Sequence, residues 1–188
     1  DTATPEIYTL SLPDALPILP YPYGMWNASM ARRHWLMKSE PDAYSWEQLL
    51  ADGSTHWDGV RNYQARNLMR DDMKEGDLVL FYHSNCKPPH VAGVAQVSKE
   101  GYPDFSAWDE DSKYFDPKTN PDEPTWMMVD IEPVATLSTT VELPDMRANP
   151  ALEGMALLQR FQRLSVQPVG EEHFAEVCRM GGLDTATI

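Results

Sequence analysis

The sequence predicts an α+β fold: a small mixed β-sheet that curls into a barrel, with short helices around it. Three observations lead to this prediction. The chain has 188 residues, of which 42% are hydrophobic, which is enough for one domain with a buried core. Apolar strand-like runs recur along it, separated by short helical segments. Because the strands do not alternate regularly with long helices, a doubly wound α/β fold is not expected.

Residues 1–29 differ from the rest of the chain. They contain five prolines and neither lysine nor arginine. A secretory signal begins with basic residues and continues with an uninterrupted apolar stretch, and this segment has neither. Its string YTLSLPDALPI resembles translated sequencing-adapter read-through. We therefore expect either a disordered leader or a non-native segment, a biological start at Met30 or Met25, and one domain over residues 30–188.

The domain is expected to begin with a strand and two helices. Residues 34–38 read as a strand, which ends before Pro41 because proline cannot donate a hydrogen bond to a ladder. Ser45 is a typical helix N-cap, and Gln48 three residues later completes a capping box for a short helix. Residues 62–72 form the second expected helix.

The middle of the chain contains a predicted hairpin and a long connection. Residues 78–83 and 91–98 are strand-like, and the proline-stiffened segment 84–90 is expected to join them as a hairpin. Residues 102–125 form an acidic connection, and loops of that length in compact domains are usually functional or disordered. The remaining expected elements are a strand at 126–137, a helix at 151–161, a strand at 163–169 and a helix at 171–180. The residues assigned to the core are Trp35, Leu36, Leu80, Trp126 and Val129.

The charge of the chain limits the kinds of partner it can bind. The formal net charge is −14, which argues against broad nonspecific binding to a phosphate backbone. The charge is uneven: residues 104–123 contain seven acids and two lysines, whereas residues 61–70 contain three arginines and no acid. Any contact with nucleic acid is therefore expected to be small in area and sensitive to salt.

The two cysteines and the hydropathy pattern exclude several other classes. Cys86 and Cys178 form no CxxC motif, so neither a disulfide scaffold nor structural zinc is expected. No apolar run approaches the roughly 20 residues of a membrane helix. We expect a cytoplasmic protein with no cofactor, no metal and no membrane partner.

A polar loop between strand-like regions carries the functional signal. Within seven residues it contains Trp57, Asp58, Arg61, Asn62 and Tyr63. A core segment does not need so many hydrogen-bonding side chains beside an aromatic ring, whereas a pocket for a flat polar ring does. The loop therefore predicts a nucleobase-binding pocket.

Six sequence blocks occur in order over about residues 34–179: WLMKSEPDAYS, WDGVRNYQARN, GDLVLFYHSN, YFDP, WMMVDI and RLSVQPV. Together they resemble the EVE domain family. The resemblance implies a PUA-like pseudo-barrel of five or six strands and kinship to YTH domains, which read N6-methyladenine in RNA. It also implies a non-catalytic reader of modified cytosine in DNA, such as 5-methyl- or 5-hydroxymethylcytosine; bacterial members are associated with restriction and defence. Two departures are Trp46, where a smaller aliphatic residue is more usual, and the acidic segment 104–123.

A reader of one modified base extrudes it from the duplex, stacks it on aromatic rings and hydrogen-bonds its Watson–Crick edge. The resemblance favours Trp57 as one stacking wall and Trp108 as the other, although a core position for the first and a surface position for the second are the plain alternatives. The expected base-contacting polar residues are Ser39, Asp58, Asn62, Ser84 and Asn85. The expected phosphate-contacting residues are Lys38, Arg61 and Arg66.

Several of these assignments have structural alternatives. Asn62 also suits a helix N-cap, Ser84 and Asn85 also suit a hairpin turn, and each cation also suits a solvated surface. At the level of function, the same pocket suits modified RNA, whose single-stranded bases are already unstacked. Some PUA-like domains resemble small amidohydrolases on modified nucleosides, but no nucleophile–base set or zinc-deaminase motif is present here. A third alternative is a protein-interaction module that uses residues 104–123. Because no effector domain is evident, an effector protein partner is expected.

Overall fold

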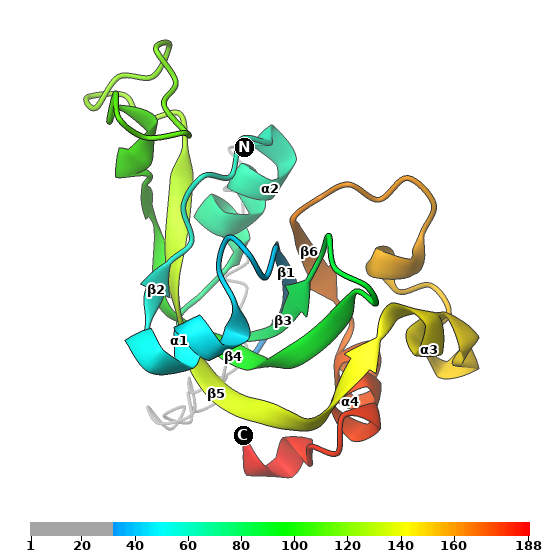
Figure 1. Cartoon of the computed structure of the whole chain (residues 1–188). Coiled ribbons are helices and arrows are strands. Elements are labelled where there is room, and N and C mark those ends of the chain that lie inside the picture. Colours follow the sequence, from blue (N-terminus) through cyan, green and yellow to red (C-terminus); the bar gives the residue numbers. More distant parts are fainter. Residues whose placement is uncertain (1–31) are drawn as a thin grey trace, which may run out of the picture. The chain divides into compact units, whose positions relative to one another are not determined.

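The computed structural model describes residues 32–188, and the expectation for residues 1–29 lies outside this part of the chain. A six-stranded mixed sheet has the order β2-β5-β4-β3-β1-β6 (Figure 1). The strands are β1 (His34–Ser39), β2 (Thr55–His56), β3 (Leu78–His83), β4 (His90–Pro103), β5 (Met127–Glu142) and β6 (Val166–Val169). The helices are α1 (Trp46–Asp52), α2 (Tyr63–Asn67), α3 (Leu143–Ala148) and α4 (Glu171–Met180). The predicted α+β class, a mixed sheet with short helices around it, is confirmed.

Alternating side chains bury both faces of the sheet. Trp35 and Met37 of β1 belong to a core cluster that includes residues of α1 and α2, whereas Leu36 belongs to a second cluster with residues of α3 and α4. The same alternation divides β3 between the two clusters, so every residue of β3 is buried. A strand at the centre of two cores has to be apolar on both faces, which explains the continuous run LVLFY. The five residues assigned to the core from the sequence are all buried.

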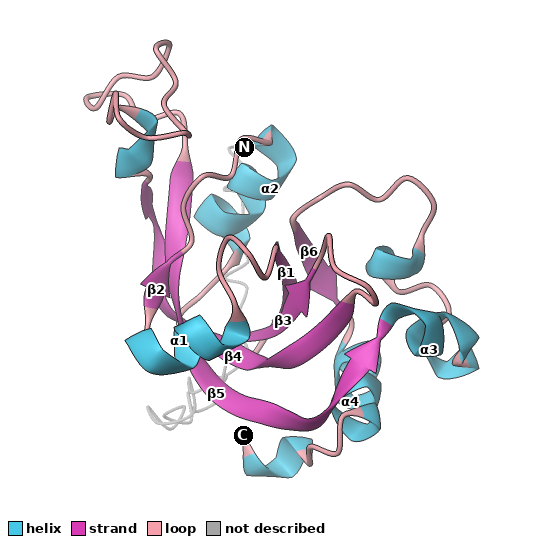
Figure 2. Ribbon diagram, viewed as in Figure 1, coloured by secondary structure: helices cyan, strands magenta, loops and turns pink. Residues whose placement is uncertain are grey.

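The two longest strands are strongly curved (Figure 2). Register shifts interrupt the pairing of β4 with β5 at several points, including Val91/Gly93 and Val97/Lys99. Extra residues of this kind bend a strand and increase its twist, which allows a small sheet to wrap around a core. The predicted hairpin of β3 and β4 is present, and its register also shifts between Phe81 and Tyr82.

Trp46 fills a space that a glycine leaves open. Its indole ring is 2% exposed, and its Nε1 donates a hydrogen bond to Thr136 Oγ1 at 3.0 Å. The ring packs across β4 at Gly93, where an added Cβ would lie 2.2 Å from the ring. The bulky Trp46 is thus matched by a glycine on the strand that it packs against.

The predicted helix over 151–161 is wrong. Two short 3₁₀ turns, Pro150–Leu152 and Ala156–Leu158, occupy this segment instead. Gly154 separates them with a φ of +87°, a left-handed conformation that an α-helix cannot contain. The apolar spacing of three and four arises because Leu152 and Met155 turn into the second core cluster from irregular backbone.

Three other elements differ from the sequence-based expectation. Helix α3 was not predicted, and Pro144 in its first turn is compatible with a helix start. The expected helix over 62–72 is a short α-helix followed by a π-turn, Leu68–Asp72. Strand β2 was missed because its two residues are held by pairing with β5 and not by a local pattern. By contrast, α1 begins after Ser45, whose Oγ accepts a hydrogen bond from Gln48 N as predicted.

The packing of Trp46 on Gly93 predicts an unusual response to a small substitution. We expect Gly93→Ala to lower the free energy of unfolding by about 1–3 kcal/mol, because the methyl group overlaps the indole ring. Alanine in a strand would otherwise be favourable. Urea denaturation of Gly93→Ala in the wild-type and Trp46→Leu backgrounds measures this effect. An equal loss in both backgrounds would mean that the indole is not the cause.

Candidate functional site

Three strand ends meet at one edge of the sheet. Strands β1 and β3 are parallel, so their carboxyl ends lie side by side, with Ser39 opposite His83. The backbone N–H of Ser84 donates to the Ser39 carbonyl at 2.8 Å, and the Lys38 N–H donates to the Ser165 carbonyl at 2.8 Å. The start of β6 therefore lies beside the ends of β1 and β3. A cavity of about 800 Å³, the Trp57 pocket, opens at this edge.

Aromatic side chains from three separate segments line the Trp57 pocket. Trp57 is 9% exposed and packs edge-on against Phe81, with ring centroids 5.6 Å apart. Its backbone N–H donates to the Val129 carbonyl at 2.8 Å, which fixes the loop to β5. Tyr44 and Tyr114 are partly exposed and lie in the lining of the same cavity. The cavity thus offers one buried ring and two accessible rings.

Polar and charged groups complete the lining. They are Lys38, Ser39, Glu40, Thr55, His56, Asp58, Ser84, Lys113, Arg163 and Ser165. Burial, and then the charge of Asp104, raise the pKa of the Asp58 carboxyl above its ordinary value. Burial also lowers the pKa of the Lys38 ammonium. Both groups are therefore partly withdrawn from water. In such a partly buried position, hydrogen bonds to a ligand are stronger than at an open surface.

Tyr114 is held in place by a glycine and an arginine. Gly59 has a φ of +73°, and an added Cβ would lie 2.5 Å from the Tyr114 ring, so only glycine permits this approach. Arg61 donates from Nε and Nη2 to the Tyr114 carbonyl at 3.0 and 2.5 Å. The backbone and the ring of Tyr114 are thus both fixed by residues of the loop that follows Trp57.

Arg61 has no free hydrogen-bond donor. Besides the Tyr114 carbonyl, its N–H groups reach Asp104 Oδ2 at 2.7 Å, Ser106 Oγ at 3.3 Å and the Val60 carbonyl at 3.4 Å. A guanidinium has five N–H groups, and these contacts account for all of them. Asp104 is fully buried and also accepts from Gly59 N at 3.0 Å. Arg61 is therefore a structural link between two loops.

Five of the residues predicted from the sequence meet in the Trp57 pocket. They are Lys38, Ser39, Trp57, Asp58 and Ser84. Ser39 is partly engaged, since its Oγ donates to the Tyr44 carbonyl at 2.7 Å. Asn85 lies just outside, where its side chain donates to Glu40 Oε1 at 2.6 Å.

The other four predicted site residues have different positions. Asn62 is the N-cap of α2, with Oδ1 accepting from Gln64 N and Ala65 N. Arg61 is occupied as described, and Arg66 donates to the Thr125 carbonyl at 2.5 Å and to Asn67 Oδ1. Trp108 does not line the pocket; its backbone N–H closes the 3₁₀ turn Phe105–Ala107.

Several lining residues were not predicted from the sequence. Tyr114 is the aromatic residue of the acidic connection that lines the pocket, and it lies in the YFDP block that had already been singled out. Tyr44, Lys113 and Arg163 were also missed, because each lies in a loop whose position depends on distant parts of the chain.

No cluster of three or more His, Cys, Asp or Glu side chains within residues 32–188 could hold a metal ion. Over the same residues, no helix has the length and apolar character needed to cross a membrane.

Comparisons with known proteins identify the family of the chain. The EVE domain family matches residues 33–180. Human thymocyte nuclear protein 1 is 41% identical over 160 residues, which cover 75% of this chain and 70% of the human protein. A hypothetical protein from Leishmania major has a solved structure with a TM-score of 0.77 and 45% identity, covering 81% of this chain and 96% of that one.

Another similar protein has been solved together with nucleic acid. It is human THYN1 protein in complex with 5-methylcytosine containing DNA, with a TM-score of 0.75 and 39% identity, covering 79% of this chain and 97% of that one. The extent of the family match and the identity to the human protein lead to one conclusion. The chain belongs to the EVE domain family, as the six sequence blocks indicated.

Proposed function

We propose that this protein is a non-catalytic reader of a modified nucleobase in DNA, 5-methyl- or 5-hydroxymethylcytosine, which it binds extruded in the Trp57 pocket. The observation that carries the proposal is the convergence of Trp57, Tyr44 and Tyr114 with hydrogen-bonding side chains at the junction of three strand ends. The DNA complex of human THYN1 supports DNA as the partner. The effector protein and the cytoplasmic location expected from the sequence stay predictions.

The pocket suits a flat ring that carries polar edges. Stacking on an aromatic side chain contributes roughly 1–3 kcal/mol per base and does not depend on the identity of the base. Asp58, when ionised, is a suitable acceptor for the exocyclic amine of cytosine. A buried methyl group adds only about 0.8 kcal/mol, or roughly fourfold in affinity. A larger preference for the modified base requires a close wall around the methyl group, and Trp57 and Tyr114 are the rings available for it.

The arrangement of Lys38 and Glu40 favours binding over catalysis. They flank Ser39 in the sequence and would have to serve as the base and the acid if the site were that of an amidohydrolase. In the structure the Lys38 ammonium is 3.5 Å from the Gln162 carbonyl, and Glu40 accepts from Asn85. Each side chain is directed to another partner, and neither activates Ser39, whose hydroxyl donates to a backbone carbonyl. A general base must reach the proton that it removes, and this geometry does not provide that contact.

Binding to matched duplexes tests the proposal. The duplexes carry one cytosine, 5-methylcytosine or 5-hydroxymethylcytosine at the same position, and fluorescence anisotropy measures their affinity. We expect a preference for a modified duplex. Tyr114→Leu should lower the affinity for that duplex by roughly 5- to 100-fold, because one ring that stacks on the base is removed. Trp57→Leu, checked for folding by thermal melting, should behave in the same way.

Trp108→Leu is the matched control. It removes a large aromatic ring from the same connection but from outside the pocket, so the affinity and the preference should stay as in the wild type. Equal affinity of the wild type for all three duplexes would refute the proposed function. A preference that appears only with the matching RNA would make modified RNA the ligand.

The raised pKa of Asp58 predicts the pH dependence of binding. Only the ionised carboxylate accepts from the base amine, so affinity should fall as the pH drops through this raised pKa, which lies above the ordinary 3.8. The fall should approach about tenfold per pH unit below that pKa. Titration of duplex affinity between neutral and acidic pH measures it, and Asp58→Asn should remove this component of the pH profile.

Asp58→Asn should also change stability in the free protein. A carboxyl group whose pKa is raised by folding stabilises the fold below its unfolded-state pKa, and that contribution is lost as the pH rises through the folded-state pKa. At neutral pH the ionised Asp58 is therefore a cost to the fold. Asp58→Asn should melt at a higher temperature than the wild type at pH 7 while binding more weakly. A lower melting temperature would show that the carboxylate is stabilised by contacts other than those described.

Arg61 is expected to affect binding through Tyr114 and not through a phosphate. Arg61→Lys keeps the charge but cannot replace the five donors, so we expect a loss of about 1–3 kcal/mol in unfolding free energy and weaker binding to the modified duplex. The slope of log affinity against log salt should stay as in the wild type. A phosphate contact would give the opposite pattern, with unchanged stability in Arg61→Lys and a smaller slope in Arg61→Gln.

A further inference from the structure

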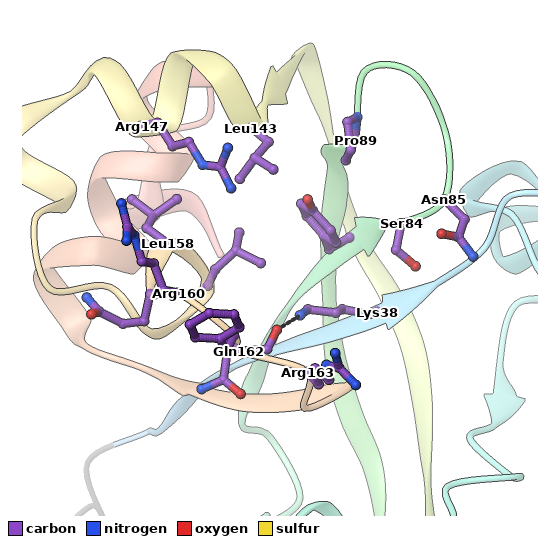
Figure 3. A pocket seen from close by; sticks show the side chains of 14 residues that line it. Lys38, Ser84, Asn85, Pro89, Leu143, Arg147, Leu158, Arg160, Gln162 and Arg163 are labelled. Atoms are coloured by element: carbon purple, nitrogen blue, oxygen red, sulfur yellow. Dashed lines mark hydrogen bonds between the residues drawn. The ribbon is translucent and has the colours of Figure 1, made fainter.

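A second cavity lies beside the Trp57 pocket. It has a volume of about 740 Å³ and lies between the ends of β1 and β3, helix α3 and the segment that leads into β6 (Figure 3). Lys38, Ser84 and Arg163 line both cavities, so the two adjoin one another. We call this second cavity the arginine groove. Its other lining residues used below are Arg147, Arg160 and Phe161.

The arginine groove is positive although the chain has a net charge of −14. Four cationic side chains line it, and no aspartate or glutamate is among its lining residues. Figure 3 shows Arg147 reaching into the groove from α3 and Lys38 from β1. None of Lys38, Arg147, Arg160 and Arg163 forms a salt bridge within residues 32–188. Unpaired charges of one sign around a concave surface produce a local field that attracts a ligand of opposite charge.

Phe161 has an unfavourable conformation at the edge of this groove. Its φ is +61°, which bulky side chains rarely adopt, and the residue is 90% exposed. Burial of the ring in the protein core therefore does not offset the backbone strain. The next residue ties the segment to the rim, since the Gln162 carbonyl accepts from the Lys38 ammonium at 3.5 Å. Strained residues of this kind cluster at active sites and ligand-binding segments.

The exposed Phe161 ring is close to the Trp57 pocket, into which a base would be extruded from the DNA duplex. Phe161 lies two residues before Arg163, which lines both cavities. Extrusion of a base from a duplex leaves its neighbour without a stacking partner, and an aromatic ring can replace that partner. Arg160 and Arg163, the cations that flank Phe161 in the sequence, line the same groove.

We propose that the arginine groove holds the DNA strand that flanks the extruded base, and that Phe161 stacks on the neighbouring base. This inference rests on the proposed function, because it gives the path of the same strand outside the Trp57 pocket. Arg147 and Arg160 contact the phosphates of that strand. The ligand class of the groove is thus a phosphodiester strand, whose charge complements the four cations.

Two exposed arginines outside the Trp57 pocket give the first test. Arg147→Gln/Arg160→Gln is compared with Arg70→Gln/Arg179→Gln, which changes the net charge equally at exposed positions outside the groove. With a duplex that carries one 5-methylcytosine, the groove variant should bind at least about tenfold more weakly at low salt. Its slope of log affinity against log salt should be smaller by about two, at roughly 0.9 for each lost phosphate contact. Affinity and slope equal to those of the control variant would overturn the proposal.

A glycine substitution tests the role of Phe161. Phe161→Gly removes the ring and relieves the backbone, so its melting temperature should equal or exceed that of the wild type. Its affinity for the duplex should nevertheless fall by roughly 5- to 100-fold, which corresponds to the stacking of one base on an aromatic ring. Wild-type affinity in Phe161→Gly would refute stacking by this ring.

The mononucleotide 5-methyl-dCMP separates this inference from the proposed function. It fills only the Trp57 pocket, so it should bind the wild type and all the groove variants equally, and Tyr114→Leu more weakly. If the wild type shows no preference for a modified base, the proposed function fails. If that preference is present and the groove variants bind the duplex as the wild type does, only the path of the strand is wrong.

Discussion

The buried ion pair of Arg61 and Asp104 is the interaction on which the site depends. Its nitrogen and oxygen atoms are 2.7 Å apart, and the Asp104 side chain has no exposure to solvent. A buried carboxylate is tolerated only when it is fully hydrogen-bonded, and Asp104 also receives the N–H groups of Gly59 and Ser106. The pair therefore joins the loop after Trp57 to the acidic connection. Because those two segments provide Trp57 and Tyr114, the geometry of the pocket follows from one ion pair.

The sheet determines where the pocket opens. β1 and β3 are parallel and neighbouring, so the loops that follow them leave from one edge. β6 enters at that same edge because it runs antiparallel to β1. The two core clusters hold β1 and β3 from both faces, which leaves no freedom for these strand ends to move apart. Loops that differ in sequence can thus meet at a fixed place, as is usual for binding sites on a rigid scaffold.

Much of the fold could be predicted from local patterns. β1 and β3 follow from apolar strand-like runs, α1 from its capping residues and α4 from the acids of its first turn, and the β3–β4 hairpin follows from its loop. The helix over 151–161 failed because the same apolar spacing also suits two turns joined by Gly154, and the choice depends on packing against α4. Tertiary contacts override a local pattern of this length.

The site was predictable only where a side chain follows a strand or a distinctive loop. Ser39 ends β1, Ser84 follows β3, and Trp57 and Asp58 follow β2, so their common edge is set by the sheet. Arg61 and Arg66 read as free cations, yet each is bound to groups more than 40 residues away in the sequence. Composition shows how many cations a chain has. Whether they are available to a ligand depends on hydrogen-bond acceptors that are distant in the sequence, and local sequence patterns do not reveal these.

The difference between the cations that a chain contains and those that are available to a ligand bears on how an acidic protein binds DNA. A net charge of −14 opposes nonspecific association with phosphates along most of the surface. The sequence suggested the arginines of residues 61–70 as the basic face. In the structure they are hydrogen-bonded to Asp104, the Thr125 carbonyl and Asp71. Four cations that form no salt bridge within residues 32–188 lie instead beside the Trp57 pocket: Lys38, Arg147, Arg160 and Arg163. For the proposed reader, the arginine groove places positive charge beside the pocket in which the base is inspected, so contacts to the strand and contacts to the base form together.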